Sequence, residues 1–376
     1  MASTSPVQLS SEQASFPAQS PNEAPVPRQD ADRLPRLILD AADRHGDRVA
    51  LRIRRDDVLR EVSYREMAAR IRGAAARLKG AGIREGDRVV LLGENDPQWP
   101  IAYFAISEAG ATVVPLDPGL PPASLRRLFE ASSPRLLVVS RSQRDRLDDT
   151  SEWNLVSLEE LSFGDGPIAR LADAPPDPDA DASLASVIFT SGTSGQPKGV
   201  MLAHEGLAYA GRDCAVPLWG LTDRDEMLLV LPLHHVYGFA AALVGGLVAG
   251  ASLTFVEAIR GDVILAAINE THTTILPAIP RLLELFHQQI LRQVRAKGEP
   301  SLTAFRAMGG ACATLRRTVG WNAGPLVFKA VFDRFGGSLR RLVSAGAPLP
   351  LEVNLGLARL GFSVLEGYGL TETSAA

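Results

Sequence analysis

The sequence predicts an α/β fold with two subdomains, each a mostly parallel sheet covered by helices. Short apolar runs rich in Val, Ile and Leu alternate with helix-like stretches along most of the chain, as in parallel strands joined by helices. A length of 376 residues permits a sizeable core and more than one domain. An acidic, Pro-rich stretch at residues 171–183 indicates a loop between two alternating regions.

We therefore expect three regions along the chain. Residues 1–33 are rich in Ser, Pro, Gln and Ala and lack the basic and apolar regions of a secretory signal. They are predicted to be a disordered tail. Residues 34–182 would form the first α/β subdomain and residues 183–376 the second.

The individual elements follow from the apolar runs and their spacing. The predicted strands are Arg88–Leu92, Thr112–Leu116, Leu136–Ser140, Val187–Thr190, Met227–Leu231, Ser252–Val256, Thr273–Leu276, Leu342–Ser344 and Ser363–Leu365. The helices predicted between them include Tyr64–Ala81, Trp99–Ala109, Leu125–Ala131 and Pro280–Lys297.

One uncharged run, residues 236–256, is long enough to span a bilayer. It contains several glycines, and a buried helix that turns at Ala249-Gly250 into a strand explains it better. We therefore expect no membrane span.

Composition excludes several classes of partner. A net charge of −4 does not favour binding to nucleic acid or to an anionic membrane. Cys214 and Cys312 are too few for a disulfide framework and have no metal-ligand spacing, so both are expected to be small buried residues in a reducing cytoplasm. The basic residues within Leu291–Lys297 favour a solvated helix face over a lipid anchor.

The most informative segment begins at the apolar run Val187–Phe189. It leads into a loop of Thr, Ser and Gly that closes on a single cation, Lys198, after which a helical pattern is expected. Small hydroxyl residues and glycines allow backbone N–H and side-chain O–H groups to point at one anionic centre. A mobile Ser/Gly linker is the alternative, but the flanking strand and Pro-Lys-Gly turn favour a polyphosphate site.

This loop differs from a Walker loop, because Gln196 and Pro197 separate Gly195 from Lys198 and no hydroxyl follows the lysine. A dinucleotide-binding fold is also poorly supported, since no G-x-G-x-x-G opens a helix with a suitable carboxylate beyond it.

Residues Thr190–Gly199 (TSGTSGQPKG) resemble the phosphate loop of the adenylate-forming superfamily, which includes acyl-CoA synthetases and peptide-synthetase adenylation domains. Two further blocks, Pro232–Gly238 and Glu366–Thr373, are similar to family blocks and occur in the same order. Between them Ser344–Leu349 resembles the adenine-side segment. The resemblance runs from about Leu34 to the end of the chain.

The resemblance implies roles for the residues of each block. The ATP phosphates would be bound by Thr190, Ser191, Gly192, Thr193, Ser194, Gly195 and Lys198. The alternative for this loop is a local Ser/Thr turn network. The adenine or AMP would lie against Gly346, Ala347, Pro348, Glu366, Gly367 and Tyr368. Tyr368 would stack on the adenine face, or else be a core aromatic.

The catalytic residues implied are His235, Thr371 and Glu372. His235 matches the histidine where the carboxylate meets the α-phosphate, and Thr371 would donate to that phosphate. Glu372 is the candidate Mg²⁺ ligand, because Mg²⁺ takes one or two carboxylates together with phosphate oxygens and water. His235 and Phe239 would border the acyl pocket, with a core phenylalanine as the alternative for Phe239.

The substrate class rests on further resemblance. The runs at 279–284, 328–335 and 336–340 are more similar to long-chain fatty acyl-CoA synthetases than to amino-acid adenylating domains. We therefore expect ATP-dependent activation of a fatty or other hydrophobic carboxylic acid to the acyl-adenylate and then to acyl-CoA, with ATP, Mg²⁺ and CoA. A homo-oligomer is compatible with the sequence.

Two other functions stay open. One is a fatty-acyl-AMP ligase that loads a carrier protein, and the other is a catalytically silent nucleotide- or acyl-binding module. The sequence stops at Ala376, whereas the family continues with a ribose-binding segment and a domain that carries a catalytic lysine. The expectation is an N-terminal part with impaired activity on its own.

Overall fold

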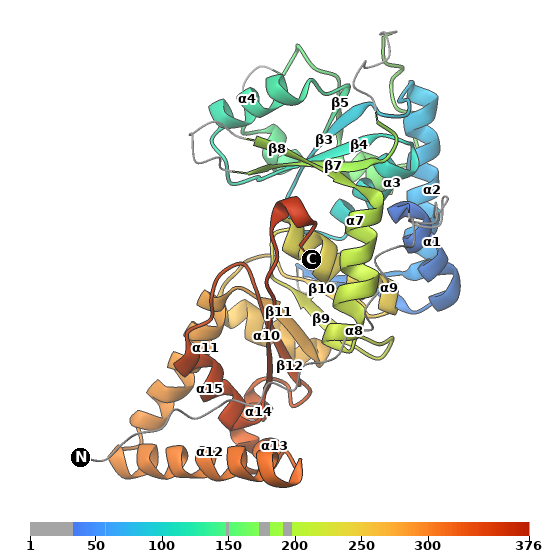
Figure 1. The fold of residues 1–376 in the computed structure, drawn as a ribbon. Helices are drawn as coiled ribbons and strands as arrows, with labels where there is room; N and C mark the ends of the chain where they lie inside the picture. Colours follow the sequence, from blue (N-terminus) through green and yellow to red (C-terminus); the bar gives the residue numbers. More distant parts are fainter. Residues whose placement is uncertain (1–32, 57, 148–149, 173–180, 191–197, 376) are drawn as a thin grey trace, which may run out of the picture.

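Two sheets, each covered by helices, form the framework of the computed structural model, which describes residues 33–56, 58–147, 150–172, 181–190 and 198–375. Figure 1 shows one sheet above the other, with the long helix α12 at the far end of the lower lobe. Most strand pairs in both sheets are parallel. The predicted fold class is confirmed.

The upper, six-stranded sheet has the order β6-β5-β3-β4-β7-β8. Its pairs are parallel except the last, in which β8 runs antiparallel to β7. The strands are β3 (Arg88–Leu92), β4 (Thr112–Leu116), β5 (Leu136–Val139), β6 (Leu155–Ser157), β7 (Leu184–Thr190) and β8 (Lys198–Ala203).

The lower, seven-stranded sheet has the order β13-β12-β11-β9-β10-β1-β2, and only the edge pair β1–β2 is antiparallel. Its strands are β1 (Val49–Arg55), β2 (Val58–Ser63), β9 (Glu226–Leu229), β10 (Ser252–Phe255), β11 (Ile275–Ala278), β12 (Arg341–Ser344) and β13 (Ser363–Glu366).

All nine predicted strands are present, and β3 and β4 have the predicted limits, but β1, β2, β6 and β8 were not predicted. β1 and β2 carry four arginines and a glutamate among their residues, which hides the apolar periodicity. The helix expected directly after Lys198 is wrong, because β8 comes first and pairs along β7. The helix begins only at His204.

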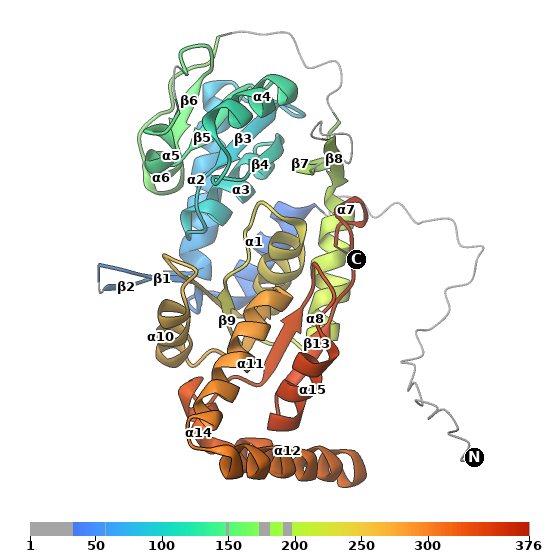
Figure 2. The same ribbon diagram turned by 90° about the vertical axis from the view of Figure 1, so that its left-hand side faces the viewer.

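Helices cover both faces of each sheet (Figures 1 and 2). On the upper sheet, alternate side chains of β3 face opposite cores: Val89 and Leu91 join the core that includes α2 and α3, and Val90 and Leu92 join α4. The helices of the first part of the chain are α1 (Leu34–His45), α2 (Tyr64–Ala81), α3 (Gln98–Glu108), α4 (Pro122–Ser132), α5 (Arg141–Arg144) and α6 (Leu158–Phe163).

The lower sheet is covered in the same way. Leu228 and Leu342 face a core shared with α10, α11 and α15, whereas Met227 and Val343 face the core shared with η2 and α9. The remaining helices are α7 (His204–Ala208), η1 (Tyr209–Ala215), α8 (Val216–Trp219), η2 (Tyr237–Val244), α9 (Gly245–Ala249), α10 (Gly261–Thr271), α11 (Pro280–Arg295), α12 (Glu299–Val319), α13 (Gly324–Val327), α14 (Lys329–Arg334), α15 (Leu351–Leu360) and η3 (Thr371–Thr373).

Helix α2 begins and ends at the predicted residues because both ends carry local signals. The Ser63 hydroxyl accepts a hydrogen bond from the Glu66 N–H at 3.1 Å, which satisfies a backbone donor of the first turn. At the other end Gly82 has a φ of +103°, a left-handed conformation that ends a helix and suits glycine.

The strands of the two sheets are not divided at the predicted boundary near residue 183. The hairpin β1–β2 comes early in the chain but forms the edge of the lower sheet, and β7–β8 come after the boundary but close the upper sheet. The division into residues 34–182 and 183–376 therefore stays a prediction about folding units.

The uncharged run at 236–256 folds as expected. It forms the π-helix η2 and the short helix α9, turns at Gly250 with a φ of +84°, and continues as β10. Within the described part of the chain, no helix combines the length and apolarity needed to cross a membrane.

We predict that a buried histidine makes folding sensitive to mild acid. His204 is 4% exposed, its Nδ1 accepts from the Leu34 N–H at 3.3 Å, and burial lowers its pKa from 6.5 to about 4. The unfolded chain therefore binds more protons between these two values. The contribution of His204 to the free energy of unfolding is complete above pH 6.5 and falls as the pH drops toward 4, by up to about 3 kcal/mol.

Urea unfolding measured across this pH range tests the prediction. His204→Gln should flatten part of the loss, and His272→Gln, at an exposed helix end, should leave it unchanged. An unaltered pH slope in His204→Gln contradicts the assignment.

Candidate active site

The ends of the phosphate-loop segment lie opposite each other in a hairpin. Thr190, the last residue of β7, pairs with Lys198, the first residue of β8. Residues Ser191, Gly192, Thr193, Ser194 and Gly195 lie outside the described residues. A Cβ on Gly199 would lie 2.9 Å from Val187 Cγ1, so glycine lets β8 pack closely on β7. The hairpin fixes the position of Lys198 at the start of β8, and the lysine side chain is exposed.

The third sequence block lies beside this hairpin. The turn η3, which carries Thr371 and Glu372, contacts β8, and the Ser374 hydroxyl fills the place where a Cβ on Gly206 would lie, 2.7 Å away. Thr373 Oγ1 accepts from the Leu370 N–H at 3.1 Å and closes the turn. Glu372 is exposed, so its carboxylate is available beside the strand that begins at Lys198.

The adenine-side segment follows β12 and turns away from the sheet at Gly346, whose φ is +87°. This left-handed conformation favours glycine. The Ser344 carbonyl accepts from the Gly367 N–H at 2.8 Å, which joins the segment to the block after β13. Gly346, Ala347 and Pro348 are exposed, and the structure brings them together with Glu366, Gly367 and Tyr368 at one sheet edge.

Tyr368 is 87% exposed, which excludes a packed core aromatic. A large aromatic ring held in solvent is available to stack on a planar ligand. Glu366 is held at the end of β13 by Asn354, whose Nδ2 donates to Oε1 at 2.6 Å.

The histidine pair follows β9, at the same carboxyl edge of the parallel strands. His234 is almost buried, and desolvation lowers its pKa to about 4, with His235 adding to the effect and Asp117 opposing it. The His234 Nε2 atom lies 3.7 Å from Asp117 Oδ1, but a neutral imidazole makes this a contact and not an ion pair. Burial also lowers the pKa of His235, so both rings are neutral at pH 7.

Packing around η2 fixes the loop between β9 and η2, residues 230–236, which carries His234 and His235 and is called the histidine loop. A Cβ on Gly238 would lie 2.4 Å from the Pro232 carbonyl oxygen, so the close approach requires glycine. The Tyr237 hydroxyl donates to the Val343 carbonyl at 3.0 Å, which ties η2 to β12, the strand before the adenine-side segment.

Phe239 belongs to a buried aromatic cluster. It is 1% exposed, and its ring lies 4.2 Å from Tyr103 and 6.0 Å from Trp99 of α3. Its predicted contact with an acyl chain remains a prediction.

The residue that holds the histidine loop, Asn95, was not predicted from the sequence. Asn95 follows β3 of the upper sheet; its Nδ2 donates to the Leu231 carbonyl at 2.6 Å and its Oδ1 accepts from the Leu233 N–H at 3.1 Å. Its position just beyond a parallel strand was a usable signal, but its partners lie more than 130 residues away in the chain.

Known proteins are similar to this chain in both sequence and fold. The sequence matches the AMP-binding enzyme family over residues 38–376. The chain belongs to this family. It is similar to the long-chain-fatty-acid–CoA ligase FadD15 of Mycobacterium bovis, with 28% identity over 85% of this chain and 57% of that protein. It is also similar to a feruloyl-CoA synthase of an Amycolatopsis species, with 25% identity over 83% of this chain and 55% of that protein.

The chain therefore spans a little over half the length of these curated relatives. Its fold is similar to that of the Klebsiella oxytoca NpsA N-terminal subdomain in complex with 3-hydroxyanthranilyl-AMSN. The TM-score is 0.67 at 22% identity, over 91% of this chain and 74% of that one.

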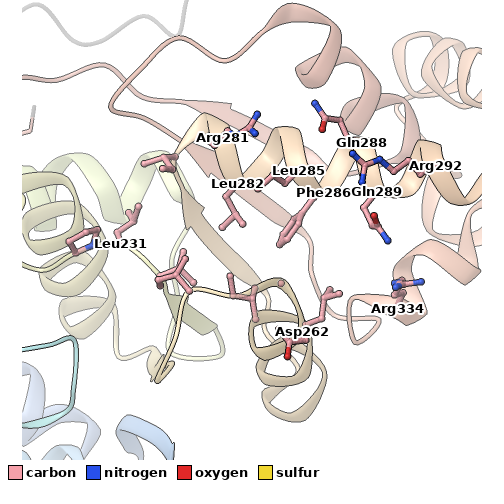
Figure 3. Close-up of a pocket in the computed structure, with 17 residues that line it drawn as sticks. Leu231, Asp262, Arg281, Leu282, Leu285, Phe286, Gln288, Gln289, Arg292 and Arg334 are labelled. Carbon is pink, nitrogen blue, oxygen red and sulfur yellow. The ribbon is translucent and has the colours of Figure 1, made fainter. Parts of the chain in front are cut away.

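A cavity of about 590 Å³ opens between α10 and α11. Figure 3 shows Leu231 at one end, Leu282 and Phe286 along the wall, and Arg292 and Arg334 at the other end. Most of its lining is apolar, and it begins at Leu231–Pro232 of the histidine loop, just before the two histidines. Neither His235 nor Phe239 lines it.

We predict that Asn95→Ala disturbs the histidine loop, because two hydrogen bonds to backbone groups are lost. The unfolding free energy should fall by about 1–3 kcal/mol, and ATP binding should weaken. Asn154→Ala, which removes a single exposed hydrogen bond to the Arg135 carbonyl, is the matched control. Equal small losses in both variants, measured by urea unfolding and calorimetric titration, would contradict this role for Asn95.

Proposed function

We propose that this AMP-binding enzyme activates a hydrophobic carboxylic acid, with a fatty acid preferred, as an acyl-adenylate that is then transferred to CoA. The observation that supports this most is the proximity of three segments: the Lys198 hairpin, the adenine-side segment Ser344–Leu349 and the block Glu366–Thr373. The turn η3 of this block contacts β8 at the Lys198 hairpin, and the Gly367 N–H of the same block donates to the Ser344 carbonyl of the adenine-side segment.

The proposed reaction joins two anions, because a carboxylate oxygen attacks the α-phosphorus of ATP and pyrophosphate leaves. The site has to neutralise charge and hold the reactants in line. Thr190, the loop that follows it and Lys198 would bind the β- and γ-phosphates. Thr371, on the turn beside β8, would donate to the α-phosphate.

The histidine loop would position the carboxylate. His235 is exposed at the carboxyl end of β9, and its lowered pKa keeps the ring neutral at pH 7. A neutral imidazole donates one hydrogen bond to a carboxylate oxygen without forming an ion pair, which leaves the oxygen nucleophilic. Asn95 would act indirectly, by holding the backbone on the amino side of this ring.

The described side chains suit a Mg²⁺ ion that is held jointly by Glu372, phosphate oxygens and water. Among the described residues no three His, Cys, Asp or Glu side chains gather into a metal site, so a cage made by protein alone is not indicated there. Glu372 is a single exposed carboxylate beside the proposed phosphate site, which suits Mg²⁺ shared with phosphate oxygens and water. A bound Mg²⁺ would neutralise phosphate charge, and Glu372 would hold it.

The acyl chain of the proposed substrate would occupy the cavity between α10 and α11. The cavity begins beside the residues that precede His235 and runs outward along apolar side chains, and its volume lies in the usual range for ligand sites. The similarity to a fatty-acid ligase favours a long aliphatic acid, and the similarity to a feruloyl-CoA synthase makes aromatic acids the first competitors to test.

Pyrophosphate exchange with a panel of fatty and aromatic acids tests the function, on residues 1–376 and on any longer product of the gene. Lys198→Ala should lower exchange by roughly 10–100-fold, because a charge-assisted contact contributes about 1.5–3 kcal/mol. Lys329→Ala is the control, since that exposed lysine pairs with Asp333 on α14. Nucleotide binding without exchange for any acid favours the silent module. If a carrier-protein thiol accepts the acyl group and CoA does not, the product is that of a fatty-acyl-AMP ligase.

A separate prediction concerns chain length. Leu282→Trp places a larger side chain in the cavity, so exchange with long-chain acids should fall several-fold while short acids are retained, because the indole takes up space that a long acyl chain would fill. Leu326→Trp, at a residue 71% exposed on α13, is the control, and thermal unfolding confirms that both variants fold. A uniform loss of exchange for all acids in Leu282→Trp would indicate that the acyl chain binds outside this cavity.

A further inference from the structure

A second cavity, of about 520 Å³, lies between α11, α12 and α15. Four arginines line it: Arg292 and Arg295 on α11, Arg306 on α12 and Arg359 on α15. Figures 1 and 2 show that these helices meet in the lower lobe, away from the upper sheet. None of the residues of the three sequence blocks lines this cavity.

The four guanidinium groups have little compensating charge. Glu352 is the one carboxylate among the residues that line the cavity, and no ion pair of these arginines occurs within the described part of the chain. Two of the three acids in residues 280–341 already pair elsewhere, Glu284 with Arg281 and Asp333 with Lys329.

The imbalance extends over the whole segment. Residues 280–341 contain eleven Arg and Lys against three Asp and Glu, in a chain whose net charge is −4. Like charges on neighbouring helices repel one another, and a concave basic surface concentrates its field on the space in front of it. An anion placed there relieves the repulsion.

The shape is built by close helix packing. A Cβ on Gly356 of α15 would overlap the His287 ring of α11 at 2.2 Å, and one on Gly309 of α12 would lie 3.4 Å from Arg359 Cβ. These glycines let the three helices approach, so their arginines face one shared hollow. The sequence favoured a solvated helix face for residues 291–297. The structure adds Arg306 of α12 and Arg359 of α15, which lie on other helices and line the same cavity.

We propose that this cavity, the arginine pocket, binds a phosphate-bearing ligand. Arginine presents a planar fork of donors that matches phosphate oxygens in pairs, and several such forks recognise a dianion better than a monovalent anion. The phosphate belongs either to a free phosphorylated molecule or to the headgroup of an anionic lipid. The pocket shares Gln288 and Arg292 with the apolar cavity, so a ligand with both a phosphate and an acyl chain has a place for each.

Calorimetric titration with inorganic pyrophosphate tests the pocket, using Lys198→Ala protein so that the proposed ATP site contributes less. We expect binding to persist in Lys198→Ala and to weaken by roughly tenfold or more when Arg306→Gln and Arg359→Gln are added. The matched control adds Lys297→Gln and Arg317→Gln, two exposed cations of the same segment that do not line the pocket. Arg306→Lys with Arg359→Lys keeps the charge but not the fork, and should recover binding only in part.

The source of the phosphate is decided by sedimentation with phosphatidylcholine vesicles that do or do not contain phosphatidic acid. Pelleting that requires phosphatidic acid and is lost in Arg306→Gln/Arg359→Gln identifies a lipid headgroup, whereas pyrophosphate binding without pelleting identifies a free phosphate. The proposal is overturned if neither probe binds, if Lys198→Ala alone abolishes binding, or if the control pair weakens binding as much as the pocket pair. None of these outcomes depends on acid activation, so the proposed function stands or fails separately.

Discussion

The contact between Phe239 and Tyr103 is the constraint on which the geometry of the site depends. It joins η2, which follows the histidine loop of the lower sheet, to α3, which covers the upper sheet. Tyr103 is fully buried, and its hydroxyl is hydrogen-bonded to Ser186 of β7 at 2.5 Å. Through these side chains the strand that leads to the phosphate loop and the helix that follows the histidines share one core. Their separation cannot change without opening that core.

Parallel pairing explains why the blocks meet although they are far apart in the sequence. β9, β12 and β13 run in the same direction in one sheet, so the loops after them emerge at one edge. The hairpin β7–β8 approaches this edge from the other sheet and reaches the turn η3. Bonds between the loops, such as that from the Gly367 N–H to the Ser344 carbonyl, then fix their spacing.

Sequence patterns predicted the elements whose signal is local. The strands β3 and β4 and the helix α2 have the predicted limits, because an unbroken apolar run or a capped amphipathic pattern is contained within each. β1 was missed because its arginines pair with partners brought by folding, as Arg52 does with Glu61 and Glu226. Asn95 and the arginine pocket were missed for a related reason: each is defined by contacts between segments that no local pattern connects.

The distribution of positive charge separates the two proposed anion sites. The lowered pKa values keep both histidine rings neutral at pH 7, so the rings add no positive charge to the proposed carboxylate site. The described blocks contribute one lysine, Lys198, at the hairpin. Five cations of α11 and α12 have no ion-pair partner among the described residues: Arg292, Arg295, Arg306, Arg316 and Arg317. The proposed arginine pocket and the proposed adenylation site therefore carry their positive charge on different elements.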